Sequence, residues 1–251
     1  MTRIGFRLAL AYRSNLFMTC VTLVAQVFLL RMIWTSVYGS RPTAAGLTLE
    51  ALLAYLTLAN LQAFATHTIV ARVIHQRIRT GMVFFDLARP VGYLRQMAAF
   101  QVGNTVGGLL LLAPVVPVVL LVGSITVPVN GTGYVITLGL GYVIAVQLAL
   151  LISLIGFWTM EIGAISLLYR LVSQFFAGTM VPLAFFPGLL GTLADLLPFK
   201  YLGYVPAAVY VGHISDVSGP VVVELAWIAG LWGLLRLTWS RAHRRVVIQG
   251  G

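Results

Sequence analysis

Residues 96–160, QMAAFQVGNTVGGLLLLAPVVPVVLLVGSITVPVNGTGYVITLGLGYVIAVQLALLISLIGFWTM, contain no charged side chain. A water-exposed surface cannot be built from such a stretch, because about a quarter of the residues of a soluble domain are charged. In hydrocarbon every backbone N–H and C=O must be paired inside the protein, so such segments cross as helices of about 20 residues. Turn residues between 128 and 133 divide the stretch. It therefore predicts one span within residues 96–122 and the next within 134–159.

The rest of the chain has the same character, with 60% hydrophobic and 9% charged residues and a mean hydropathy of +0.98. A transmembrane barrel would show short alternating segments, which are absent. The net charge of +10 suggests nucleic-acid binding. However, the arginines flank apolar runs, where the positive-inside rule places them. We therefore expect an all-α integral membrane protein that contacts membrane lipids, binds no nucleic acid and forms one transmembrane domain over residues 1–251.

Six transmembrane helices are predicted, of which the two above are the third and the fourth. The others are expected at residues 16–32, 51–71, 171–186 and 220–239. Pro182 should kink the fifth span, and residues 161–170 should form a short interfacial link before it. In the sixth span both Glu224 and Arg236 must reach opposite membrane interfaces, because a charged side chain is costly inside the bilayer.

Three further segments flank these spans. Residues 1–15 have apolar side chains at helical spacing and arginines between them, which predicts an N-terminal interfacial helix. Residues 72–95 are the most polar part of the chain and form the main cytoplasmic loop. Residues 188–219 are too long for a tight turn and are interrupted by Pro198 and Pro206, so we expect an extracellular re-entrant hairpin.

The orientation follows from counting basic residues. With the N-terminus inside, thirteen arginines face the cytoplasm, whereas Arg31, Arg41 and Lys200 face the other side. The positive-inside rule therefore places both termini in the cytoplasm, since an even number of spans returns the chain to its starting side.

The sequence shows no constellation for catalysis or for binding a metal. It has no His-Glu-x-x-His motif, no carboxylate pair, no phosphate-binding loop and no nucleophile elbow. The six acidic residues fall at or outside the predicted span ends, so a proton relay is not evident. His67, near the end of the second span, is interpreted as structural. We expect no catalytic residue in this chain.

Two groups of residues are candidates for binding. In the loop, Ile74, Ile78, Val83 and Phe84 form one apolar face of a short helix with arginines around it. This pattern fits docking of a partner protein and equally fits attachment to anionic lipid. Within the spans, Asn60, Gln62 and Gln174 are polar side chains that face either a protein interface or a transported substrate.

The order of these features resembles the permease subunit of a bacterial ABC-type exporter, in the six-span class that is encoded separately from its ATPase. The resemblance covers essentially the whole chain. The residues that carry it are IHQRIRTG at 74–81, LARP at 87–90, PLAFFPG at 182–188, LPF at 197–199 and Pro206-Ala207.

The resemblance implies roles for the segments. The loop corresponds to a coupling helix that docks into a groove on the ATPase, with Ile74, Arg77, Ile78, Arg79, Gly81, Phe84 and Arg89 as the coupling residues. The extracellular hairpin is marked by Pro187, Pro198, Phe199 and Pro206. ATP and Mg would be bound by the partner ATPase, and this chain would bind no cofactor and would not be an enzyme.

The resemblance also implies a function. Two permease chains, identical or related, would pair with cytoplasmic ATPase subunits in the inner (plasma) membrane of a bacterium. Together they would export an amphipathic, drug-like, peptide or lipid-like substrate. The alternative is an ion-coupled transporter or a channel that works without an ATPase.

Overall fold

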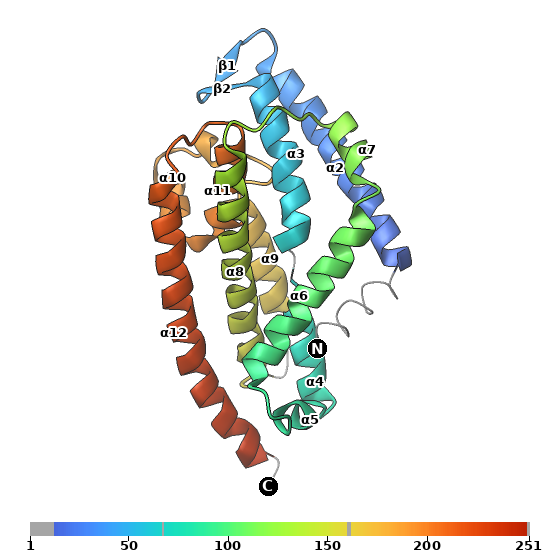
Figure 1. The fold of residues 1–251 in the computed structure, drawn as a ribbon, viewed down its shortest axis with the longest axis vertical. Helices are drawn as coiled ribbons and strands as arrows, with labels where there is room; N and C mark the ends of the chain where they lie inside the picture. The colour runs from blue at the N-terminus through green and yellow to red at the C-terminus, as the bar shows by residue number, and fades with distance from the viewer. Residues whose placement is uncertain (1–12, 67, 160–161, 250–251) are drawn as a thin grey trace.

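The computed structural model describes residues 13–66, 68–159 and 162–249, and in these ranges the chain is almost entirely helical (Figure 1). The α-helices are α2 Arg13–Tyr38, α3 Leu49–Thr66, α4 Val70–Arg79, α5 Val83–Leu87, α6 Tyr93–Leu112, α7 Val116–Val122, α8 Gly131–Ile155, α9 Gly163–Phe176, α10 Gly188–Leu196, α11 Tyr204–Tyr210 and α12 Ser218–Gln249. Two short 3-10 helices, η1 Leu183–Phe185 and η2 Pro198–Leu202, complete them. The interfacial helix predicted for residues 1–15 lies almost wholly outside the described residues, as does His67.

The helices form an elongated bundle with two different ends (Figure 1). A small antiparallel hairpin, β1 Thr43–Ala44 paired with β2 Leu47–Thr48, joins α2 to α3 at one end, which we call the hairpin end. Helices α4 and α5 and the last turns of α12 lie at the other end, which we call the α5 end. Every helix that runs the length of the bundle therefore connects the hairpin end with the α5 end.

Fewer helices are long enough to span a membrane than the sequence predicts. Among the described residues, Cys20–Tyr38, Gly131–Ile155 and Ser218–His243 are long and apolar enough, and α6 with α7 makes a fourth if the bent pair is one span. Helix α3 has 18 residues and α9 has 14. At about 1.5 Å per residue they measure about 27 and 21 Å, less than the roughly 30 Å hydrocarbon core. Six crossings stay a prediction.

The third predicted span is a broken helix rather than a continuous one. Helices α6 and α7 are bent by 64° at the residues between them. Pro114 lies at this break, where it has no N–H to donate to the carbonyl group of Leu110 and its ring crowds that carbonyl. The Arg31 guanidinium caps the end of α7 by donating to the carbonyl oxygens of Val122 at 2.8 Å and Gly123 at 3.0 Å.

The prediction for the fifth span is wrong at both ends. Helix α9 begins at Gly163, so most of the expected link at residues 161–170 is helical. The helix ends at Phe176, because Gly178 adopts a φ of +70°, a left-handed conformation that commonly terminates helices. Pro182 therefore lies beyond the helix and does not kink it.

The prolines of the following region begin helices instead of only interrupting the chain. Pro187 precedes α10, Pro198 is the first residue of η2, and Pro206 lies in the first turn of α11. Proline is tolerated there because the first N–H groups of a helix have no intrahelical partner. Helix α10, the 3-10 helix η2 and helix α11 thus occupy most of the region predicted as a hairpin.

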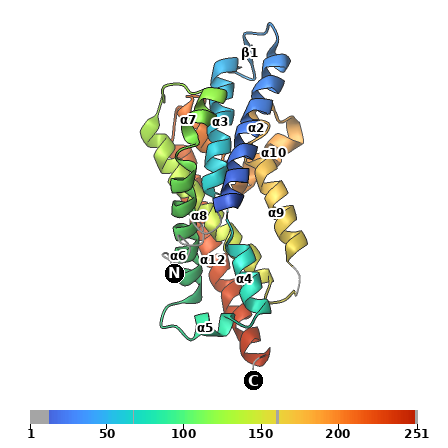
Figure 2. The ribbon, with the colours of Figure 1, turned by 90° about the vertical axis from the view of Figure 1, so that its right-hand side faces the viewer.

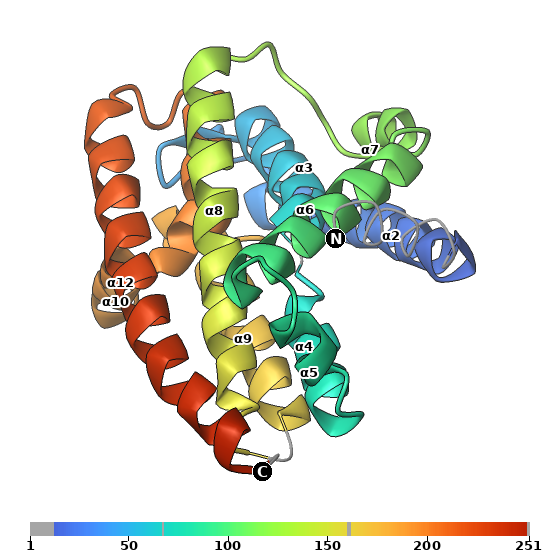
Figure 3. The same cartoon turned by 60° about the horizontal axis from the view of Figure 1, so that its bottom comes forward.

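The central helix of the bundle is α8, which lies between α12 and α6 (Figures 1 and 3). Every fourth residue along one of its faces is small and buried: Gly133, Thr137, Gly141, Ala145, Ala149 and Ser153. Small side chains let neighbouring backbones approach closely, which is how membrane helices gain packing energy. Helices α12, α11 and α4 and the short η2 all pack on α8.

The expectation that Glu224 reaches a membrane interface is wrong. This side chain has 0% exposure, and neither carboxylate oxygen has a hydrogen-bond partner among the described residues. Glu224, Leu231, Leu235 and Ala242 are all buried, and their spacing puts them on the face of α12 that packs inward. Arg236 is exposed and stacks on Trp232 at 3.6 Å. The helical register, rather than the distance to the interface, decides where the carboxyl group lies.

The row of small residues on α8 gives the first prediction. A Cβ atom at Gly141 would overlap the carbonyl oxygen of Tyr201 in η2, whereas one at Gly139, on the same helix, meets nothing within 4 Å. Gly141→Ala should destabilise the fold by about 1–3 kcal/mol through overpacking. The matched variant Gly139→Ala should keep or raise stability, because alanine favours helix. Thermal unfolding in detergent measures both, and equal unfolding temperatures would contradict the packing argument.

Candidate functional site

The α5 end carries a compact tip that an ion-pair cluster holds together. Asp86 has 1% exposure and pairs with Arg77, and Arg89 lies 3.7 Å from its second carboxylate oxygen. Gln96, at the start of α6, donates to the Asp86 carbonyl oxygen at 2.8 Å. Gly81 makes the turn from α4 towards α5, with a φ of +71° that favours glycine. Arg77 and Arg89 therefore stabilise the tip itself.

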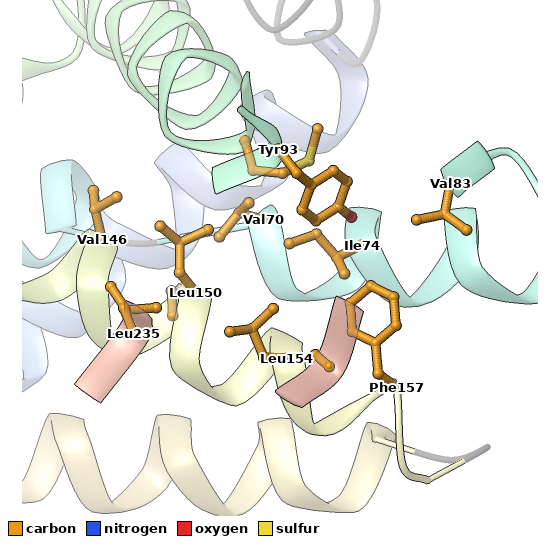
Figure 4. Packing of buried hydrophobic residues seen from close by; sticks show 12 residues of the cluster. Val70, Ile74, Val83, Tyr93, Val146, Leu150, Leu154, Phe157 and Leu235 are labelled. Atoms are coloured by element: carbon orange, nitrogen blue, oxygen red, sulfur yellow. The ribbon is translucent and has the colours of Figure 1, made fainter. Parts of the chain in front are cut away.

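The tip is anchored on the lower part of α8 by apolar packing (Figure 4). Ile74 and Val83 are buried in one cluster with Leu150, Leu154 and Phe157. Ile78 is partly buried against the same cluster. Most of the apolar face predicted for partner docking thus points into the protein, and Ile74, at 0% exposure, offers no surface to a partner.

The apolar side chains that the tip exposes are two phenylalanines and one methionine. Met82, Phe84 and Phe85 are exposed, and Phe85 is the most open of them at 69%. We call these three residues the aromatic tip. Exposed Arg79 and Arg89 belong to the same end. Phe84 and Arg79 were predicted from the sequence, whereas Phe85 was missed, although two adjacent phenylalanines in a polar loop are a visible signal.

A second feature is a cleft of about 100 Å³ between α3 and α9, which we call the polar cleft. Helix α9 contributes Ser166, Tyr169, Arg170, Ser173 and Gln174, and the other lining residues are Ala63, Thr66, Thr68, Ala71, Ala177, Thr179 and Leu202. Hydroxyl groups, one amide and one guanidinium are therefore gathered in a chain that is otherwise strongly apolar. Figure 2 shows α9 on the flank of the bundle away from α6 and α7.

The structure separates the three predicted pathway residues. Gln174 lines the polar cleft. Asn60 donates to the carbonyl oxygens of Leu56 and Thr179, and Gln62 donates to that of Gly203. Both of these side chains are buried and hold irregular backbone in place. The polar residues of α9 were missed, although Ser166, Arg170, Ser173 and Gln174 repeat at helical spacing.

The chemistry of these features is that of binding and movement. No group of three or more His, Cys, Asp or Glu in the described ranges could hold a metal ion. Hydroxyl and amide groups bind polar parts of a molecule, and the apolar residues around them bind the remainder. A helical bundle embedded in the membrane, with a docking-type tip at one end and a polar cleft in its flank, has the parts of a transport permease.

The comparison with protein families agrees with this class. Residues 21–250 match the family described as ABC-2 family transporter protein. The chain therefore belongs to this family and is a permease of an ABC transporter, the type that works with a cytoplasmic ATPase. No curated protein and no solved structure matches it.

The polar cleft should be hydrated, whereas the opposite face of α9 should lie in lipid. Gln174 lines the cleft, and exposed Leu168 does not. Replacing the single cysteine, Cys20, by serine gives a background for Gln174→Cys and Leu168→Cys. A water-soluble maleimide should label the first variant and spare the second, because the thiolate that reacts forms in water and is disfavoured in apolar surroundings. Equal labelling of both positions in membranes would show that the cleft is not a separate aqueous site.

Proposed function

We propose that this chain is the transmembrane subunit of an ATP-driven exporter. It pairs with a second permease chain and with cytoplasmic ATPase subunits that bind ATP and Mg, and it moves an amphipathic, drug-like, peptide or lipid-like substrate outward. The observation that carries the proposal is the aromatic tip, because an exposed apolar patch at the end of a polar, arginine-rich segment is typical of a protein-docking surface.

The packing of the tip supports a coupling role. Ile74 and Val83 join it to α8, and the Arg77–Asp86 pair joins α4 to α5. A close-packed unit moves as a body rather than deforming, so a displacement of the tip by the ATPase is passed to α8. Helices α12 and α11 pack on α8 and would move with it.

The polar cleft supports a role in the pathway. Its hydroxyl groups and Arg170 suit the polar part of an amphipathic molecule, and a second permease chain would close the open side of the cleft. In this arrangement the prolines at 187, 198 and 206 mark an extracellular re-entrant hairpin. The α5 end faces the cytoplasm of a bacterium, both termini are cytoplasmic, and six segments cross the plasma membrane.

Docking at the aromatic tip can be tested directly. Phe85→Asp should abolish association with the ATPase. Docking would take the new carboxylate out of water without giving it a partner of opposite charge. Val127→Asp, at an 85% exposed position in the loop between α7 and α8, is the matched control and should keep the ATPase. Co-purification and ATP hydrolysis measure the outcome. Retention of the ATPase by the Phe85 variant would refute docking at the tip.

Charge reversal in the tip has two separable effects. Arg79→Glu alters an exposed side chain and should weaken ATPase association while the permease stays folded. Arg77→Glu places a second acid beside buried Asp86 and should unfold the tip itself. Ile78→Pro should also unfold it, because proline inside α4 removes a helical hydrogen bond. Size-exclusion elution and limited proteolysis distinguish loss of docking from loss of folding.

One observation favours the alternative, an ion-coupled transporter that works without an ATPase. Glu224 is a buried carboxyl group without a hydrogen-bond partner in the described ranges, and such groups mark ion or proton pathways in membrane proteins. Purification from native membranes in mild detergent separates the two functions. An ATPase should co-purify in the proposed exporter, and transport by the permease alone that is lost in Glu224→Gln would establish the alternative.

A further inference from the structure

A groove of about 460 Å³, which shares no lining residue with the polar cleft, runs over α8 between α6 and α12. Figure 3 shows α8 flanked by these two helices. Val102, Val143, Val146 and Leu150 are among the apolar residues that line it. Its volume lies within the range of about 300–1,000 Å³ that is typical of ligand sites. The walls suit a hydrocarbon chain.

Two arginines from two different helices lie among the residues that line the groove. Arg95 of α6 and Arg236 of α12 both line it, and no described Asp or Glu does. Neither guanidinium forms an ion pair with a carboxylate of the described residues. The Arg236 guanidinium is held 3.6 Å from the centre of the Trp232 ring, which orients it over the groove wall. The pair of arginines is therefore complementary to an anion.

The charged part of the groove lies at the depth of lipid head groups. Arg95 is in the first turn of α6, at the α5 end. Arg236 lies about 27 Å along α12 from its first residue, at a rise of about 1.5 Å per residue. This distance is close to the roughly 30 Å thickness of the hydrocarbon core. Tyr93 and Trp239, which also line the groove, stack at 4.9 Å, and Tyr and Trp residues are enriched at membrane interfaces.

We propose that the groove binds one anionic phospholipid. Its phosphate lies between Arg95 and Arg236, and one acyl chain lies along α8 between α6 and α12. The lipid bridges α6 and α12, which touch directly where Tyr93 stacks on Trp239. With the orientation proposed above, the lipid belongs to the cytoplasmic leaflet, but binding does not depend on whether the protein exports a substrate.

Native mass spectrometry can test this with the full chain in mild detergent, given equal amounts of dioleoyl phosphatidylglycerol and dioleoyl phosphatidylcholine. The wild type should retain phosphatidylglycerol in preference. Arg95→Gln with Arg236→Gln should reduce this preference about 30-fold, which corresponds to about 2 kcal/mol for two arginines near a lipid surface. The matched control is Arg72→Gln with Arg241→Gln, which removes two exposed charges outside the groove and should keep the preference.

A second variant separates the site from general folding effects. Val143→Trp fills the groove without changing charge, so it should displace the lipid while the size-exclusion profile stays that of the wild type. No preference in the wild type, or an unchanged preference in either groove variant, overturns the proposal. Displacement of the lipid by inorganic phosphate alone would overturn it in favour of a simple anion site.

The same groove could instead be covered by a second permease chain. Brominated phosphatidylglycerol should quench the fluorescence of Trp232 and Trp239 in the wild type, compared with a variant in which both are phenylalanine. Absence of this quenching, together with disulfide cross-linking of Val102→Cys between two chains, would show a protein interface and overturn lipid binding.

Discussion

The bundle depends on how closely other segments approach α8. From Gly133 to Ser153 every fourth residue on one face is small, so neighbouring segments can approach α8 closely, as the Tyr201 carbonyl group of η2 does at Gly141. Dispersion between close backbones replaces the hydrophobic effect, which does not drive association between helices in lipid. The tip on α4 and α5 packs on the last turns of the same helix. One helix thus connects the surface proposed for the ATPase with the opposite end of the bundle.

In the segment between α9 and α11, several backbone carbonyl groups are not paired within a regular helix. Helix α3 satisfies several of them from the side. Tyr55 donates to the Gly178 carbonyl oxygen at 2.7 Å, Asn60 to that of Thr179 and Gln62 to that of Gly203. Irregular backbone persists in a membrane protein only where protein groups or water pair with it. These polar side chains in a short helix therefore serve structure first.

The sequence predicted the features that depend on composition and missed those that depend on helical register. Residues 96–160 identified membrane helices because a charge-free stretch has few other structures. Glu224 was misplaced because its position along the helix suggested an interface, whereas its position around the helix buries it. The same distinction applies to the tip, where Ile74 faces inward and Phe84 outward. Arg170 was assigned to a link because one charge concealed the polar periodicity of α9.

Glu224 also constrains how the chain is assembled. In the finished fold its carboxyl group is buried, and α12 packs on α8. A lone α12 leaving the translocon would present this carboxyl group to lipid, at a cost of several kcal/mol if it were charged. Helix α8 is synthesised before α12 and offers the covering surface. We therefore expect the last helix to dock on α8 as it enters the membrane, because docking covers this carboxyl group.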